Sequence, residues 1–262
     1  MPYLVDVRHL HAAARLCMRR SSAAGADGLS WAGYRSGLPE RLAELAEQLR
    51  TGMWRPGPVR EVDITSFTGK VFTAVVPTVA DRIVHRAMRL ALDPILDQRV
   101  LRDWVSAYRR GRNRITALRQ ADTHIDAGRV WLADIDVADA SAGGTAEQFV
   151  DWLAEHVADG TFLAVFRRAL LGLPSPLVPG SGLWPVLFHL RLSQADALLD
   201  GHTVVRFADN YIAFTPTRRS AQQAFDAIST ALAVIDLRPH RRKSRIRPPY
   251  LANTEDLFLI DG

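Results

Sequence analysis

The chain has 262 residues and is 48% hydrophobic, so it can bury a core and lacks the composition of a disordered or collagenous protein. No apolar run reaches the roughly 18 residues that a membrane span requires, and the N-terminal segment lacks the basic, apolar and cleavable order of a signal peptide. A single cysteine, Cys17, excludes an intramolecular disulfide. These features predict a cytoplasmic protein with no membrane partner.

Arginine carries nearly all of the positive charge. The formal net charge is +5, and Lys70 and Lys243 are the only lysines among the 33 basic residues. Because the guanidinium group binds phosphate through two hydrogen bonds, this composition favours nucleic acid as a partner. A coding bias toward arginine and alanine would produce the same composition, so charge alone does not decide between the two explanations.

Helical spacing of apolar residues occurs in four early segments, at residues 1–20, 38–51, 79–92 and about 115–127. Ser30 is a predicted helix cap, and Asp93-Pro94 is expected to interrupt the third helix. Residues 59–64 and 71–76 are predicted strands on either side of a turn, so they form a β-hairpin.

A buried-type strand at residues 129–137 follows and ends in acidic residues. A Pro/Gly-rich loop, LPSPLVPGSGLWP, leads into a helix that ends at Leu199. The segments VVRF and YIAF flank the turn ADN and predict a second hairpin. Other helices are predicted at residues 145–158, 161–172 and 217–234, the last capped by Thr217. This order predicts an α+β fold in which a hairpin packs beside an acidic strand, with helices on one face.

Two aspartates stand at strand ends in this arrangement. Asp136 ends the strand at residues 129–137, and Asp209 lies in the turn of the second hairpin. An antiparallel sheet would bring both to one edge, where two carboxylates can bridge divalent cations such as Mg²⁺. Aspartate is also common in turns for purely structural reasons, so neither residue alone defines a site.

Seven blocks, in order from about residue 20 to residue 260, resemble bacterial reverse transcriptases of the group II intron, retron and phage-defence kind. The blocks are GADGLSWAGYRSGLPERLAELAEQLRTGMWRPGPVREV, PTVADRIVHRAMRLALDPILD, SAYRRGRNRITAL, DIDVADAS, VPGSGLWPVLFHLRLSQAD, VRFADNYIAF and DLRPHRRKSRIR. The third is similar to the family's Ser-Tyr-Gly-Phe-Arg-Pro-Gly-Arg-Ser block. The fourth, sixth and seventh are similar to its first metal strand, its metal hairpin and its lysine motif.

The resemblance implies a reverse-transcriptase-type right-hand polymerase fold of the α+β class with an antiparallel palm sheet. It implies fingers at residues 1–128 and a palm at residues 129–262, with no thumb after FLIDG, which resembles the family's Phe-Leu-Gly turn. The family's activity is RNA-directed DNA polymerisation, a nucleotidyl transfer with Mg²⁺ as the cofactor.

Four residues stand at the metal and catalytic positions of the family, and three of them match its pattern. Asp136 and Asp209 match its two principal metal-binding aspartates. Asn210 follows Asp209 where a second aspartate is typical, and its amide oxygen offers a metal ligand without charge. Lys243 matches the lysine near the pyrophosphate, where it could act as a general acid. Alternatively, Lys243 is one more charge in a basic run.

The positions that bind the nucleotide depart from the family pattern. Ser66 and Phe72 stand where a lysine and an arginine normally grip the triphosphate, so Lys70 is the candidate replacement. Ser141 stands where an aromatic ring normally lies under the sugar and excludes ribonucleotides. This small residue would relax sugar discrimination or leave the pocket unformed.

Two further nucleotide-binding candidates lie in altered motifs. Gly180 belongs to the loop VPGSGLWP, which lacks the family's glutamine and has Trp184 in place of a serine. Phe207 begins the Phe-Ala-Asp-Asn turn, where Tyr-Ala-Asp-Asp is typical. The candidates for nucleic-acid binding through phosphate contacts are Arg82, Arg86, Arg109, Arg110 and Arg112. Alternatively, these arginines only form solvated basic surfaces.

Two interpretations therefore remain open. In the first, the chain is a nucleic-acid-binding subunit with a degenerate polymerase site that works with RNA, or with a protein partner such as a second, active reverse transcriptase, in phage defence. In the second, it is an active metal-dependent DNA polymerase, RNA-directed or template-relaxed, with altered nucleotide specificity. Loss of two charged contacts to a triphosphate, each worth about 1.5–3 kcal/mol, favours the first. No motif supports a third interpretation, a nuclease.

Overall fold

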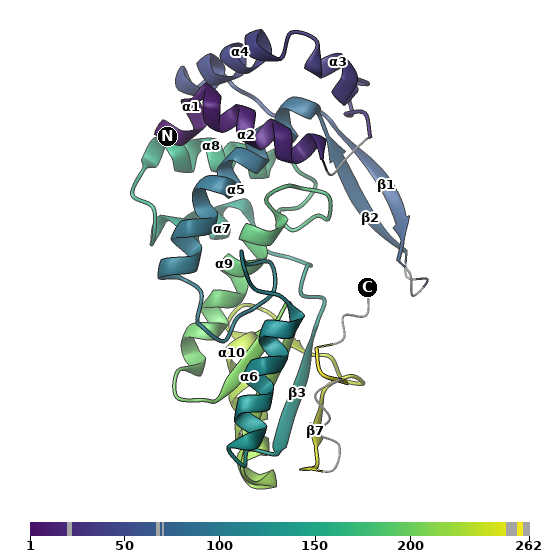
Figure 1. Ribbon diagram of the computed structural model, residues 1–262, viewed down its shortest axis with the longest axis vertical. Coiled ribbons are helices and arrows are strands. Elements are labelled where there is room, and N and C mark those ends of the chain that lie inside the picture. The colour runs from purple at the N-terminus through teal and green to yellow at the C-terminus, as the bar shows by residue number, and fades with distance from the viewer. Residues whose placement is uncertain (20–22, 67–68, 70, 250–255, 259–262) are drawn as a thin grey trace. The chain divides into compact units, whose positions relative to one another are not determined.

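The chain forms two compact units (Figure 1). The computed structural model describes residues 1–19, 23–66, 69, 71–249 and 256–258. Unit 1 consists of Met1–Arg99 and Ser141–Leu190, and unit 2 consists of Val100–Ala140 and the described residues from Arg191 onward. The chain therefore passes between the units more than once.

Unit 1 is mainly helical and carries one hairpin. Its helix α2 lies alongside α5 (Figure 1), and α1, α2 and α4 contact one another. The predicted apolar face of α4 is buried through Leu42, Leu45 and Leu49. Its elements are α1 (Pro2–Val5), α2 (Val7–Met18), α3 (Trp31–Arg35), α4 (Leu38–Arg50), β1 (Val59–Thr65), β2 (Val71–Pro77), α5 (Val79–Arg99), α7 (Ala146–Ala154) and α8 (Gly160–Leu171). Helix α9 (Trp184–Asp196) contributes residues to both units.

The predicted interruption at Asp93-Pro94 is wrong, because α5 continues through Pro94 to Arg99. Leu92 and Leu96 stand four residues apart on one helix face, and each is only 1% exposed. Apolar burial on both sides of Pro94 therefore compensates for the backbone hydrogen bond that proline removes.

The predicted helix caps are confirmed. Ser30 accepts a hydrogen bond from the Gly33 N–H at the start of α3. Thr217 caps α10 (Arg218–Ala233) in a reciprocal pair with Ser220. Among the described helices, none is long and apolar enough to cross a bilayer.

Unit 2 is built on an antiparallel sheet with the strand order β4-β5-β3-β6, and β7 also pairs with β3. The sequence predicted only three of these strands. The other two are too short for a periodic pattern and come from the basic segment DLRPHRRKSRIR. The elements are α6 (Arg114–Asp126), β3 (Trp131–Ala138), the 3-10 turn Ala197–Leu199, β4 (Val204–Phe207), β5 (Asn210–Thr215), α10, β6 (Arg238–Pro239) and β7 (Arg245–Arg247).

Both faces of the central strands are covered. All of β4 and every residue of β5 after Asn210 are buried, although successive side chains point to opposite faces of a sheet. Helix α6 contacts β4 and β5, and α10 contacts β3 and β5. The expectation of a sheet covered by helices on one face is therefore incomplete.

A buried histidine makes unit 1 sensitive to acid. His85 lies in α5, is 1% exposed, and neither ring nitrogen has a hydrogen-bond partner among the described residues. Burial disfavours the charged ring and lowers the pKa of His85 from 6.5 to about 4.

We expect the free energy of unfolding to fall by about 3 kcal/mol between neutral pH and pH 4 through His85 alone. The unfolded chain takes up a proton below pH 6.5 that the folded chain excludes until about pH 4, so this stability is lost as the pH falls. Urea unfolding across this range should show a shallower acid decline for His85→Leu than for the unaltered chain. The exposed His11→Gln serves as the control, and identical profiles for His85→Leu and the unaltered chain would contradict the assignment.

Candidate active site

Asp136 and Asp209 meet at one edge of the sheet of unit 2, as predicted. Strand β3 pairs with β5 so that Asp136 stands directly opposite Asn210. The turn that joins β4 to β5 consists of Ala208 and Asp209, because Phe207 pairs with Asn210. The N–H of Val137 donates to the carbonyl oxygen of Asp209 at 3.1 Å, which ties the turn to β3 beside Asp136.

The charges around Asp209 shift the pKa of its carboxyl in opposite directions. Burial is the main cause that raises the pKa of the Asp209 carboxyl, and the negative charge of Asp136 raises it further. The positive charges of Lys243 and Arg206 lower it. A cation bound between the two aspartates would offset their mutual repulsion.

Lys243 lies beside Asp136 of the acidic pair. Its Nζ is 3.5 Å from Oδ2 of Asp136, and its side chain is 44% exposed. The segment that carries Lys243 also hydrogen-bonds the backbone of Asp136. The His240 N–H donates to the Asp136 carbonyl at 2.7 Å, and the Ser244 hydroxyl accepts from the Asp136 N–H at 3.2 Å.

Asn210 supplies a further oxygen. Its Oδ1 is buried and has no hydrogen-bond partner among the described residues. Its Nδ2 donates to Asp134 at 3.5 Å, and Asp134 also accepts from Nε of Arg247 at 2.6 Å. Two carboxylates and an unpartnered amide oxygen fit a hard cation such as Mg²⁺. In the part of the chain that the structure describes, no three acidic, histidine or cysteine side chains gather into a metal cluster.

The predicted nucleotide-binding residues are only partly placed at this edge. Lys70 lies outside the described residues. Ser141 is exposed and belongs to unit 1. Phe207 is only 8% exposed and packs edge-on against Phe258, with ring centroids 6.3 Å apart. The ring of Phe207 therefore contributes to the core of unit 2.

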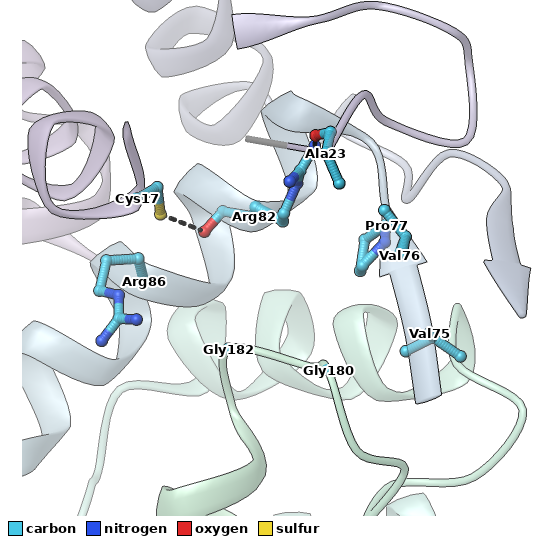
Figure 2. A pocket seen from close by; sticks show the side chains of 9 residues that line it. All are labelled: Cys17, Ala23, Val75, Val76, Pro77, Arg82, Arg86, Gly180 and Gly182. Atoms are coloured by element: carbon cyan, nitrogen blue, oxygen red, sulfur yellow. Dashed lines mark hydrogen bonds between the residues drawn. The ribbon is translucent and has the colours of Figure 1, made fainter. Parts of the chain in front are cut away.

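Gly180, Arg82 and Arg86 surround one pocket of about 220 Å³ in unit 1. In Figure 2, Gly180 and Gly182 lie below the end of β2, and the two arginines come from α5. Gly180 has φ +93°, and a Cβ there would meet the carbonyl oxygen of Val75 at 2.1 Å, so the position requires glycine.

The two pocket arginines have different surroundings. Nη2 of Arg82 donates to the Ala23 carbonyl at 2.9 Å, and its guanidinium lies over the Trp31 ring at 5.1 Å. Nε of Arg86 is buried without a hydrogen-bond partner among the described residues. An anionic group is one ligand that this nitrogen can bind.

The three arginines of the basic loop differ in their exposure to solvent. Arg109 is 8% exposed, and its Nη1 donates to the carbonyl oxygens of Arg102 at 2.7 Å and Val105 at 2.9 Å. Arg112 pairs with Asp103 at 3.2 Å. Of the three predicted phosphate ligands in this loop, only Arg110 is exposed. Arg109 therefore does not fit the alternative of a solvated surface residue, because its guanidinium hydrogen-bonds backbone carbonyls of the preceding segment.

Sequence reasoning did not single out Tyr108. Desolvation and, after it, the negative charge of Asp209 raise the pKa of its phenol, although 40% of the residue is exposed. Its backbone has φ 57°, a conformation that non-glycine residues rarely adopt. The signal available in the sequence was its position in the block SAYRRGRNRITAL.

Comparisons with known proteins agree with a reverse-transcriptase-like fold. No protein-family model matches the chain. Protein YkfC of Escherichia coli strain K12 is 25% identical over 193 residues, 67% of this chain and 49% of YkfC. The putative COX1/OXI3 intron 1 protein of Saccharomyces cerevisiae is 22% identical over 176 residues, 62% of this chain and 20% of that protein. The chain thus spans at most about half the length of these relatives.

Two solved structures share the fold. A chain of the partial Cas6-RT-Cas1–Cas2 complex matches with a TM-score of 0.51 and 18% identity, over 88% of this chain and 41% of that chain. The Cas6-RT-Cas1–Cas2 complex matches with the same TM-score and identity, over 88% of this chain and 25% of that chain. At this identity the likeness concerns the fold.

We expect Lys243→Gln to tighten Mn²⁺ binding about two- to fivefold, because the substitution removes a positive charge beside Asp136. Solvent screening of the half-exposed side chain keeps the effect small. Titration of the purified chain with Mn²⁺ at neutral pH, followed by electron paramagnetic resonance, measures the change. Arg242→Gln removes the same charge from the neighbouring exposed residue and should change the affinity less. Weaker binding by Lys243→Gln would argue against a cation site at Asp136.

Proposed function

We propose that this chain is a reverse-transcriptase-like subunit that binds nucleic acid and carries a degenerate polymerase site. The observation that carries the proposal is the position of Asn210, which opens β5 opposite Asp136 where the family has an acid. A neutral amide there lowers the negative charge available to divalent cations. The contact between Lys243 and Asp136 reduces the charge of the pair further.

The ligands of a metal ion would be Asp136, Asp209 and the amide oxygen of Asn210. When bound there, Mg²⁺ would activate a 3′-hydroxyl and stabilise the leaving pyrophosphate. The chain's own contribution would be to hold the two carboxylates at one strand edge and to keep the ammonium of Lys243 beside them. That ammonium is positioned to donate a proton to a leaving group.

An active nucleotidyltransferase with altered nucleotide specificity is the second candidate. The proximity of Asp136 and Asp209 favours this candidate. Two separate segments bring the carboxylates together although the two charges repel each other, as expected for ligands of a shared cation. In this reading, Ser141 in place of an aromatic residue would admit ribonucleotides beside deoxynucleotides.

We further propose that the chain works in the cytoplasm with RNA, DNA or a protein partner, such as an active reverse transcriptase. The similar solved structures belong to complexes that combine RT with Cas6, Cas1 and Cas2, which supports a multiprotein setting. Phage defence is the role that we propose for such an assembly.

Nucleotide incorporation by the purified complex separates the two candidates. If the chain is degenerate, Asp136→Ala should leave complex activity and phenotype unchanged. If it catalyses, Asp136→Ala should abolish incorporation and Asp209→Ala should be nearly as severe, because both carboxylates would bind the metal. The exposed Asp226→Ala on α10 is the control. A clear incorporation signal that depends on Asp136 would overturn the degenerate-site proposal.

Nucleic-acid binding should depend on particular arginines and weaken with salt. We expect Arg110→Glu and Arg86→Gln each to weaken binding of single-stranded RNA or DNA by on the order of tenfold at low salt. Each should also reduce the slope of log K against log salt concentration by about one, the value for one lost phosphate contact. Fluorescence anisotropy over a salt series measures both quantities. Arg41→Glu on α4 is the control, and an equal loss there would mean that only net charge matters.

A further inference from the structure

A buried arginine clamps the turn that carries Asp209. Nε of Arg206 donates to Oδ1 of Asp196 at 3.1 Å, and Nη2 donates to Oδ2 at 2.6 Å. The remaining terminal nitrogen, Nη1, donates to the carbonyl oxygen of Ala208 at 3.0 Å. One planar guanidinium therefore connects a helix-end carboxylate to the backbone of the turn.

The clamp is itself held on several sides. The Arg206 N–H donates to the Trp104 carbonyl at 2.9 Å, and the Ser106 N–H donates to the Arg206 carbonyl at 3.0 Å. The Tyr211 hydroxyl donates to Asp196 at 2.7 Å. Arg206 and Tyr211 have no exposed surface, and Asp196 is 1% exposed. Because all three side chains are enclosed, the guanidinium has little freedom to move.

The turn needs such a support. Ala208 has φ 56°, in the left-handed region that an L-residue other than glycine adopts at a cost of roughly 1–2 kcal/mol. Asp209 follows directly, and its carbonyl oxygen accepts from Val137. The conformation of Ala208 thus determines where the Asp209 carboxylate points relative to Asp136.

Stability alone does not account for this buried ion pair. Removing two charges from water is costly, and well-packed apolar residues in place of a buried pair are often equally stabilising. A hydrophobic substitute, however, could not donate to the Ala208 carbonyl. The hydrogen bond to the turn is the feature that only the charged, branched donor provides.

We propose that Arg206 is a positioning residue, which holds the Ala208–Asp209 turn so that the Asp209 carboxylate stands beside Asp136 and can bind a divalent cation. Asp196 orients Arg206, and Tyr211 donates a third hydrogen bond to Asp196. This inference rests on the cation site of the proposed function and adds the interaction that assembles it.

The test compares Arg206→Lys with Tyr211→Phe, using Mn²⁺ as the probe. Lysine keeps a charge for Asp196 but has a single terminal nitrogen, so it cannot serve both the carboxylate and the Ala208 carbonyl in the same geometry. Tyr211→Phe removes a hydrogen bond to Asp196 and leaves the bond to Ala208 intact. It is therefore a control for lost stability in the same buried cluster.

Two measurements report on the turn. We expect Arg206→Lys to weaken Mn²⁺ binding about tenfold, and we expect amide hydrogen exchange of Val137 to become faster. Tyr211→Phe should lower the thermal unfolding temperature and leave both readouts unchanged. Asp196→Asn, which keeps the shape of the partner and removes its charge, should shift both in the direction of Arg206→Lys. Asp196→Asn replaces Arg206→Lys in the test if Arg206→Lys does not fold.

The outcomes distinguish this inference from the proposed function. Unchanged Mn²⁺ affinity and unchanged Val137 exchange in Arg206→Lys would overturn the positioning role. Equal losses in Tyr211→Phe would also overturn it, because general destabilisation would then explain the effect. If the unaltered chain shows no Mn²⁺ binding that depends on Asp136, the cation site of the proposed function fails. Val137 exchange alone then decides whether Arg206 holds the turn.

Discussion

The antiparallel pairing of β3 with β5 is the constraint on which the candidate site depends. It places Asp136 opposite Asn210 and brings the Ala208–Asp209 turn to the end of the same strand pair. A shift of one residue would move Asp136 to the other face of the sheet, because side chains alternate along a strand. The ladder joins six residues of each strand, from Trp131 opposite Thr215 to Asp136 opposite Asn210.

The candidate site combines two carboxylates, whose negative charge is partly offset, with a turn that is hydrogen-bonded to its surroundings. The ammonium of Lys243 faces Asp136, and the neutral amide of Asn210 stands opposite Asp136 on β5. The guanidinium of Arg206 lies behind the turn, with both sides of its backbone hydrogen-bonded. These contacts keep the two carboxylates together despite their mutual repulsion.

The arginines of this protein occur in two different surroundings. Arg109 and Arg206 are buried and hydrogen-bond backbone carbonyls, so they stabilise a loop and a turn. Arg110 is exposed, and Arg86 borders a pocket with a buried nitrogen that lacks a partner among the described residues. Composition alone does not distinguish these surroundings, because a buried arginine and an exposed one have the same formal charge.

Local patterns in the sequence determined most of the helices, their caps at Ser30 and Thr217, both hairpins and the acidic strand. The convergence of Asp136 and Asp209 also followed, because ordered blocks implied one antiparallel sheet. Tertiary structure alone decided that α5 continues through Pro94, that β6 and β7 join the sheet, and that Arg109 and Phe207 are buried. It also decided the contacts of Arg206 with Asp196 and Ala208. These features depend on contacts between residues distant in sequence, whose burial and hydrogen bonds outweigh local propensity and leave no periodic trace along the chain.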